Sequence, residues 1–279
     1  MAENDTVADN APKTPSANVS PRAPVRRWQE LADEWLQRPL GKFLDYGCGP
    51  CGLLDKLQDR CDECHGVDVD ADKIADAQAR FPHFCLSAIG LDGAAPYPTG
   101  CFDTVAAVEV IEHVPDERRT FIELARLLRP GGRLLITTPH RGFLTFIDPG
   151  NFKFVFPRLH RFIHLHVWRD RAYYERRFVR GEQKGLAGDI TVAEGRRAWH
   201  RHYRLDEILS FCPEPLRLET FGVYFPGMRA LMTFAVVLRI CTGGLLRRLP
   251  WPLSALERRL SRVESHRGDQ LVILFRKAG

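Results

Sequence analysis

Short apolar runs alternate with amphipathic stretches along residues 41–139. The first apolar run ends in Phe43 and Leu44, a glycine-rich segment follows, and apolar residues then recur at helical spacing. This succession predicts a buried strand, a tight turn and a helix. A second strand is expected at 66–70, a helix at 71–80 and a third strand at 84–88.

The same alternation continues toward the C-terminus. It predicts a fourth strand at 104–111, an amphipathic helix at 115–128 and a fifth strand at 133–138, with Pro130-Gly131-Gly132 as the turn between the last two. Further elements are expected as helices at 25–36 and 205–211 and as strands at 216–223 and 270–275. Strands that alternate with helices predict an α/β fold built on a parallel sheet.

The turn after the first strand carries the first candidate chemistry. Gly47, Gly49 and Gly52 spell G-x-G-x-x-G, which alone is weak evidence for a dinucleotide site. Asp68 follows Gly47 by 21 residues and is suited to accept both hydroxyls of a ribose. Asp45 places a negative charge where a pyrophosphate would lie, and a carboxylate there suits a cofactor with a cationic end, such as S-adenosylmethionine.

Two downstream segments complete this pattern: CFDTVAAVEVIEHV at 101–114 and LLRPGGRLLITTP at 127–139. With them the chain resembles the class I S-adenosylmethionine-dependent methyltransferases, particularly the small-molecule branch that includes quinone-biosynthesis methyltransferases. The resemblance covers residues 38–139 and is faint after His140. It implies a doubly wound, Rossmann-like sheet of seven strands, the last two in a hairpin-like finish, with an inserted lid after the fifth strand.

The resemblance also implies where the cofactor lies. The expected cofactor-binding residues are Asp45, Gly47, Cys48, Gly49, Asp68, Val69, Asp92 and Glu109. Asp92 is the candidate partner of the adenine amino group, and a solvated turn aspartate is the alternative. His113 and His140, which follow the fourth and fifth strands, are candidate catalytic bases. The alternatives are a helix-entry histidine bonded to backbone for His113 and a surface loop histidine for His140.

Composition and charge divide the chain into four parts. Residues 1–24 have scarcely any large apolar side chain and are expected to be disordered. Residues 25–140 form the cofactor-binding half, 141–202 a basic aromatic insertion, and 203–279 the C-terminal half. The segment 141–204 holds 14 Lys and Arg against 6 Asp and Glu, a net charge of +8, whereas the whole chain carries +5.

The insertion and an apolar, Arg-punctuated segment at 229–246 leave several interpretations open. The insertion suits nucleic-acid binding, an interfacial membrane segment or a lid over a hydrophobic substrate. The 229–246 segment is too short for a bilayer span, and it suits a surface-lying amphipathic unit as well as a core or dimer contact. We expect no nucleic acid, and an anionic membrane surface is a candidate partner.

Eight cysteines and no signal peptide favour reduced thiols and a cytoplasmic protein, with peripheral attachment at the inner membrane face as an option. Cys48-x-x-Cys51 and Cys61-x-x-Cys64 have zinc-ligand spacing. Because the first pair lies within the cofactor turn, no metal site is predicted.

The predicted reaction is direct transfer of a methyl group from S-adenosylmethionine to a small-molecule or lipid-linked acceptor, in which the protein mainly orients the reactants. An NAD(P)-dependent oxidoreductase and a non-catalytic membrane-surface protein with the same fold are the alternatives. The sequence does not predict the acceptor atom or the oligomeric state.

Overall fold

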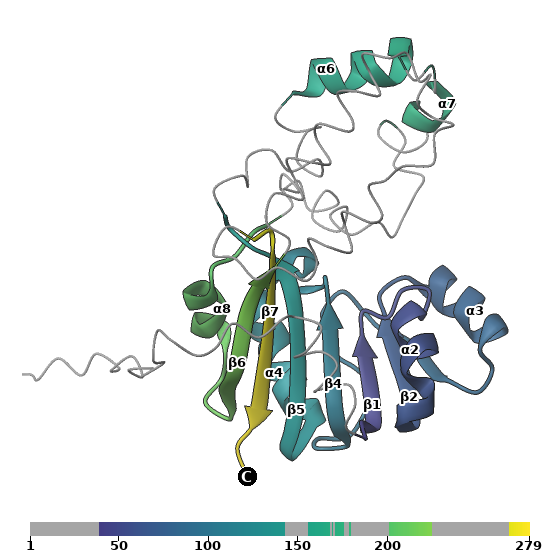
Figure 1. The fold of residues 1–279 in the computed structure, drawn as a ribbon. Coiled ribbons are helices and arrows are strands. Elements are labelled where there is room, and N and C mark those ends of the chain that lie inside the picture. Colours follow the sequence, from purple (N-terminus) through teal and green to yellow (C-terminus); the bar gives the residue numbers. More distant parts are fainter. Residues whose placement is uncertain are drawn as a thin grey trace, which may run out of the picture.

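The computed structural model describes residues 39–142, 156–167, 169, 171–175, 179, 201–224 and 268–279. Their centre is a seven-stranded sheet in the order β3-β2-β1-β4-β5-β7-β6 (Figure 1). The strands are β1 (Gly41–Tyr46), β2 (Cys61–Asp68), β3 (Cys85–Ala88), β4 (Phe102–Val108), β5 (Leu128–Pro139), β6 (Leu216–Tyr224) and β7 (Gln270–Lys277). The first five are parallel, and β7 runs antiparallel between β5 and β6. The predicted doubly wound fold and its hairpin-like finish are therefore confirmed.

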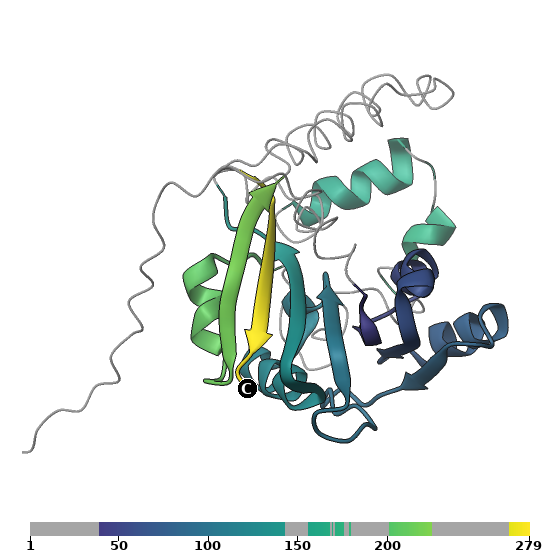
Figure 2. The ribbon, with the colours of Figure 1, turned by 60° about the horizontal axis from the view of Figure 1, so that its bottom comes forward.

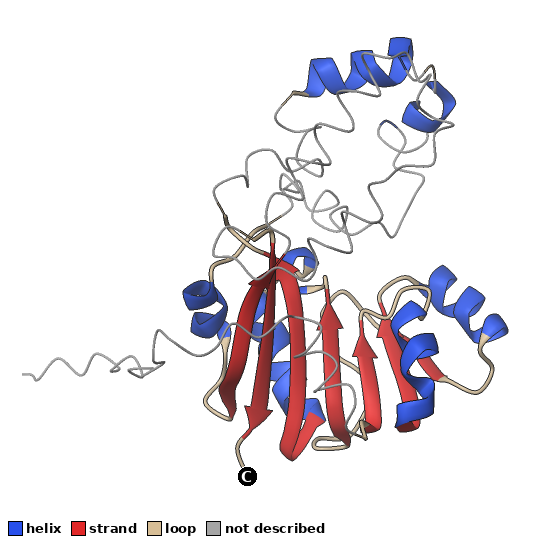
Figure 3. Ribbon diagram, in the orientation of Figure 1, coloured by secondary structure: helices blue, strands red, loops and turns tan. Residues whose placement is uncertain are grey.

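Helices cover both faces of this sheet (Figure 3). The helical elements are α2 (Gly52–Leu57), η1 (Gln58–Arg60), α3 (Ala71–Arg80), η2 (Ile111–His113), α4 (Glu117–Leu127), α6 (Pro157–Phe162), the π-helical η5 (Ile163–Val167), α7 (Arg171–Tyr174) and α8 (Leu205–Phe211). Leu54 of α2 and Ile74 of α3 belong to one buried cluster, and Phe121 of α4 and Ile208 of α8 belong to another. The two clusters are the cores on opposite faces of the sheet.

Three strand boundaries differ from the sequence predictions by three residues or more. β2 already begins at Cys61, and β4 ends at Val108 instead of 111, because Glu109 adopts a left-handed φ of 55°. β5 begins at Leu128, which pairs with Phe102 across a register shift. The Pro-Gly-Gly segment is thus an irregularity within β5 and not a turn before it, since its glycines let the strand bend without ending.

The order of the strands fixes where a ligand can bind. The chain leaves β1 toward β2 and β3 on one side and then crosses to β4 on the other, so the carboxyl ends of β1 and β4 diverge into a crevice. Figures 1 and 2 show α6 and α7, the described helices of the insertion, beyond this carboxyl edge. The predicted tail at 1–24, the helix at 25–36 and the apolar segment at 229–246 lie outside the described residues.

Candidate active site

A pocket of about 300 Å³ occupies the crevice between the carboxyl ends of β1 and β4. This volume is at the lower end of the range for small-molecule sites. Seven residues predicted from the sequence line it: Gly47, Gly49, Asp68, Val69, Asp92, Glu109 and His113. Residues from the ends of four neighbouring strands therefore meet in one place, as the parallel topology requires.

The glycine turn forms the floor of the pocket. Gly47 has φ +84°, and a Cβ added to it would approach Val110 Cγ2 to 2.4 Å. Gly49 has φ +49°, and a Cβ there would meet nothing within 4 Å, so this backbone faces open space. The amides of Gly47 and Cys48 both donate to the Val67 carbonyl, at 2.7 and 3.0 Å. The turn is thus fixed to β2 and leaves bare backbone exposed to a ligand.

Asp68 stands at the tip of β2 beside that turn. Its Oδ2 accepts the Gly49 amide at 2.8 Å, and its Oδ1 accepts the Asp70 amide at 2.9 Å. Each carboxylate oxygen has two lone pairs, so both retain capacity for a further donor. A carboxylate oriented in this way, next to open backbone, fits the ribose of a nucleoside cofactor.

Asp45 and Cys48, also predicted to bind cofactor, lie beneath the turn and are not among the pocket-lining residues. Asp45 is only 3% exposed, and burial, followed by the charge of Asp68, raises its pKa to about 7. Burial also raises the pKa of the Cys48 thiol. Asp45 therefore lies close to the glycine turn but does not contact the pocket directly.

Glu109 begins the segment that follows β4 and adopts a strained backbone, since a left-handed φ is uncommon for a residue with a side chain. Its Oε1 accepts the Thr137 hydroxyl at 2.9 Å and the side-chain amide of Gln270. The carboxylate is thereby tied to β5 and β7, and Val110 and His113, which follow it in the chain, line the pocket.

His113 lines the pocket and lies next to a buried carboxyl group. Its Nε2 is 3.6 Å from Glu112 Oε1, and the Thr138 hydroxyl donates to Glu112 Oε2 at 3.1 Å. Glu112 is 2% exposed, and burial, followed by the charge of Glu109, raises its pKa. His113 thus lies at the carboxyl edge of the sheet, where a proton acceptor would be needed.

His140, the second predicted base, lies at the end of β5 and does not line the pocket. Its Nδ1 is 2.9 Å from the Gly268 carbonyl and must carry a proton to donate there, and its amide donates to Asp269. His140 therefore connects β5 to the start of β7, and the structure does not bring it together with His113.

Sequence analysis missed part of the pocket wall. It is formed by Tyr46, by the loop after β3 and by residues 114–120 at the start of α4, including Arg119. The available signal was position, since a helix that follows a parallel strand begins at the carboxyl edge. The charged residues that line the pocket are Asp68, Asp92, Glu109, Asp116, Lys73 and Arg119, four acids against two bases.

Two further features concern metals and membranes. Among the residues that the structure describes, there is no group of three or more His, Cys, Asp or Glu side chains placed to hold a metal ion. No helix within the described ranges is long and apolar enough to cross a bilayer.

The segment that carries this pocket resembles a known type of domain. Residues 44–136, which contain the glycine turn, Asp68 and His113, match the model of a methyltransferase domain. The chain carries a class I methyltransferase domain. A ubiquinone biosynthesis O-methyltransferase from Albidiferax ferrireducens is 27% identical over 176 residues, which are 53% of this chain and 69% of that protein. A probable S-adenosylmethionine-dependent methyltransferase from Mycolicibacterium smegmatis is 36% identical over 126 residues, covering 45% of this chain and 48% of that relative.

Solved structures agree with the methyltransferase fold. An S-adenosylmethionine-dependent methyltransferase from Mesorhizobium loti superposes with a TM-score of 0.53 at 18% identity, over 89% of this chain and 97% of that one. The [4+2]-cyclase SpnF superposes with a TM-score of 0.50 at 17% identity, over 92% and 85%. The predicted family, enzyme class and cofactor, S-adenosylmethionine, are confirmed by these matches, and the oxidoreductase alternative is not favoured.

Proposed function

We propose that this methyltransferase transfers the methyl group of S-adenosylmethionine to a hydroxyl oxygen of a small, lipid-linked acceptor. The observation that carries the cofactor half of the proposal is the charge of the pocket, where four acids face two bases. A sulfonium cofactor with an ammonium group gains from that excess, whereas the pyrophosphate of a nicotinamide cofactor would be repelled.

The cofactor fits the residues present. The open backbone at Gly49 leaves a cradle that any side chain would fill, and Asp68 offers oriented acceptors for the ribose beside it. When bound, S-adenosylmethionine supplies an activated methyl group. The protein holds the cofactor on the glycine turn and positions the acceptor oxygen from the side of η2 and the start of α4.

His113 is the residue we propose to take the proton from the acceptor hydroxyl. It lines the pocket, and its Nε2 lies 3.6 Å from Glu112 Oε1. A hydroxyl needs such a base because it is a poor nucleophile while protonated. The oxygen acceptor is further supported by the ubiquinone biosynthesis O-methyltransferase relatives.

The lipid-linked nature of the acceptor is supported by the described part of the insertion. Phe156, Leu159 and Phe162 recur at helical spacing and are 52%, 47% and 54% exposed. Arg158 and Arg161 are exposed between them, and the described stretch 156–167 holds no acidic residue. Exposed apolar side chains flanked by arginines suit an anionic bilayer, where each basic residue can contribute about 1 kcal/mol of binding.

Two measurements test the reaction. Calorimetric titration should show binding of S-adenosylmethionine and none of NADH or NADPH. Incubation with methyl-labelled cofactor and a lipid extract, followed by mass spectrometry, should place the label on the oxygen of a lipid-soluble product. Label found only on a water-soluble product would refute the lipid-linked acceptor, and absence of cofactor binding would refute the function as a whole.

Membrane association is tested separately by sedimentation with vesicles. The protein should sediment with anionic vesicles at low salt, less with neutral vesicles, and should be released at high salt, because salt screens the attraction. The variant R158E/R161E should sediment less, whereas R217E, which changes an exposed arginine of β6, should behave as the wild type. Equal sedimentation of all three proteins would contradict the role of the insertion.

A further inference from the structure

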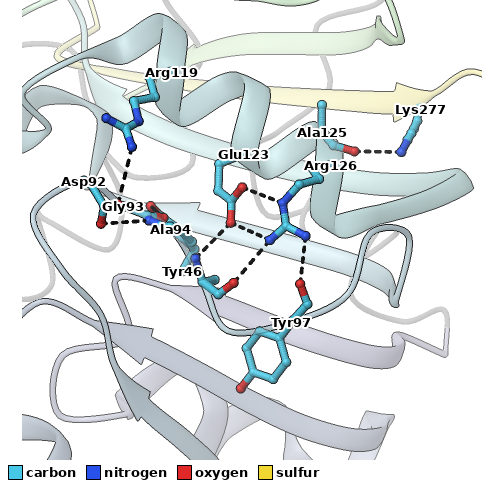
Figure 4. Close-up of polar contacts among 11 residues, drawn as sticks. Tyr46, Asp92, Gly93, Ala94, Tyr97, Arg119, Glu123, Ala125, Arg126 and Lys277 are labelled. Carbon is cyan, nitrogen blue, oxygen red and sulfur yellow. Dashed lines mark hydrogen bonds and ion pairs between the residues drawn. The ribbon is translucent and has the colours of Figure 1, made fainter.

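One wall of the pocket is a loop with no regular structure of its own. Residues 89–97 follow β3, and Ile89, Leu91, Asp92 and Gly93 among them line the pocket. A segment without helix or strand needs other contacts to keep its backbone in place. Figure 4 shows that these contacts come from α4 and from Tyr46.

The first anchor is an ion pair within α4, between Glu123 and Arg126. Arg126 Nε and Nη2 each donate to a different Glu123 oxygen, both at 2.7 Å. The same guanidinium donates from Nη1 to the Tyr97 carbonyl at 2.7 Å and from Nη2 to the Ala95 carbonyl at 3.2 Å. In return Glu123 Oε1 accepts the Ala95 amide at 2.9 Å. The pair thus presents both donors and an acceptor that match the loop backbone (Figure 4).

The second anchor is Tyr46, the residue directly before the glycine turn. Its hydroxyl donates to the Gly93 carbonyl at 2.7 Å, and the side chain is 3% exposed. Gly93 has φ +75°, and a Cβ there would lie 2.6 Å from the Tyr46 hydroxyl oxygen. Only glycine allows this approach, so the loop is fitted to the residue that also begins the cofactor turn.

A third contact is weaker. Arg119 Nη2 lies 3.4 Å from Asp92 Oδ2 at the mouth of the pocket, and these side chains are 59% and 51% exposed. Exposed pairs contribute little because water screens them. The anchoring therefore depends on Tyr46, Glu123 and Arg126, and neither Glu123 nor Arg126 lines the pocket itself.

We propose that Tyr46, Glu123 and Arg126 are positioning residues that hold residues 89–97 in the binding conformation and so set the affinity for the nucleoside half of the cofactor. The proposal rests on the proposed function, since the ligand is S-adenosylmethionine. Ordering a flexible loop when a ligand binds costs conformational entropy. A loop that is already ordered in the free protein avoids this cost, and the affinity for the ligand is therefore higher.

The test compares five variants with the wild type, one of them the double variant Y46F/R126K. R126K keeps the charge, but a lysine ammonium cannot donate hydrogen bonds to Glu123 and to both loop carbonyls at once. E123R/R126E restores an ion pair on α4 but removes the donors to the loop. Y46F removes one hydroxyl. R276K is the matched control. Arg276 likewise donates to a glutamate, Glu219 at 2.8 Å, and to a backbone carbonyl, that of Gly131 at 3.3 Å. None of these three residues lines the pocket.

We expect R126K and E123R/R126E to bind S-adenosylmethionine about tenfold or more weakly, the scale of a lost charge-assisted hydrogen bond. Adenosine should lose affinity by the same factor, because Asp92 of this loop is the expected partner of the adenine amino group. Y46F should lose less on its own, and Y46F/R126K should lose less than the product of the two single effects, since both anchor one loop. R276K should bind as the wild type.

A second readout does not depend on the ligand. In the free protein, amide hydrogen exchange at Ala94, Ala95 and Tyr97 should accelerate in R126K and stay unchanged in R276K, while the melting temperature shows that both are folded. Wild-type affinity in both Arg126 variants, or an equal loss in R276K, would overturn the positioning role. If the wild type itself bound no S-adenosylmethionine, the proposed function would fail, and unchanged exchange in R126K would then overturn the anchoring as well.

Discussion

Asp45 gives the clearest link between burial in this fold and a measurable pH dependence. The carboxyl group is 3% exposed beneath the glycine turn, and burial, with the charge of Asp68 second, raises its pKa from the ordinary 3.8 to about 7. At about 1.36 kcal/mol for each pH unit, this corresponds to a destabilisation of the ionised protein by about 4 kcal/mol at most.

The contribution of Asp45 to the pH dependence of the free energy of unfolding has the opposite sign to that of a salt-bridged aspartate. Below about pH 4, Asp45 is protonated in both the folded and the unfolded chain and has no effect. As the pH rises from about 4 to about 7, the unfolded chain ionises first, so the contribution of this group to the free energy of unfolding falls. Above about pH 7 the carboxyl group is ionised in both states, and the cost is constant.

Asp45→Asn removes this dependence. The free energy of unfolding of the variant relative to the wild type should increase between about pH 4 and pH 8, by up to about 4 kcal/mol, as measured by denaturant titration at several pH values. Asp59→Asn, at an exposed position of η1, is the control and should shift the curve little. A constant difference between Asp45→Asn and wild type across that range would show that the buried carboxyl does not titrate as argued.

Two other predictions concern the site directly. Asp68→Ala should weaken S-adenosylmethionine binding by about 1–3 kcal/mol, because the ribose hydroxyls lose a charged acceptor. Gly47→Val should abolish binding, because a side chain at this position collides with Val110. Calorimetry on the folded variants measures both effects. His113→Ala should lower turnover with little change in cofactor affinity, and a wild-type rate in this variant would exclude it as the base.

Sequence patterns predicted the parts of the site that lie close together along the chain. The glycine turn and Asp68 could be identified because a strand, a turn and a helix leave a local periodicity, and the acid follows at a fixed place on the next strand. The direction in which the Asp45 side chain points could not be predicted in the same way. β1 is buried on both faces, so alternation of polar and apolar residues does not show which side chain points toward a ligand.

The loop wall was beyond sequence analysis for a different reason. Residues 89–97 have no periodicity, and their conformation depends on Glu123 and Arg126, more than 25 residues further along the chain. Charged pairs of this spacing on a helix usually lie on a solvated face, and only the fold shows that this one bonds to backbone. The end of β4 was missed similarly, because the left-handed Glu109 is held by Thr137 and Gln270 from other strands.

The charge of the pocket leads to a last prediction, which distinguishes a methyltransferase from a protein that has the same fold but catalyses another reaction. The [4+2]-cyclase SpnF shares the architecture, so the fold alone does not specify the reaction. Methyl transfer removes the positive charge from sulfur, and a pocket with four acids and two bases should therefore hold S-adenosylmethionine more tightly than its demethylated product, S-adenosylhomocysteine. Salt screens this preference, so the ratio of the two affinities should fall toward unity as ionic strength rises, and Glu109→Gln should reduce it already at low salt. Calorimetry with both ligands over a salt series measures it. A ratio that is independent of salt, or a product that binds more tightly at low salt, would show that the acids of the pocket do not act on the sulfonium.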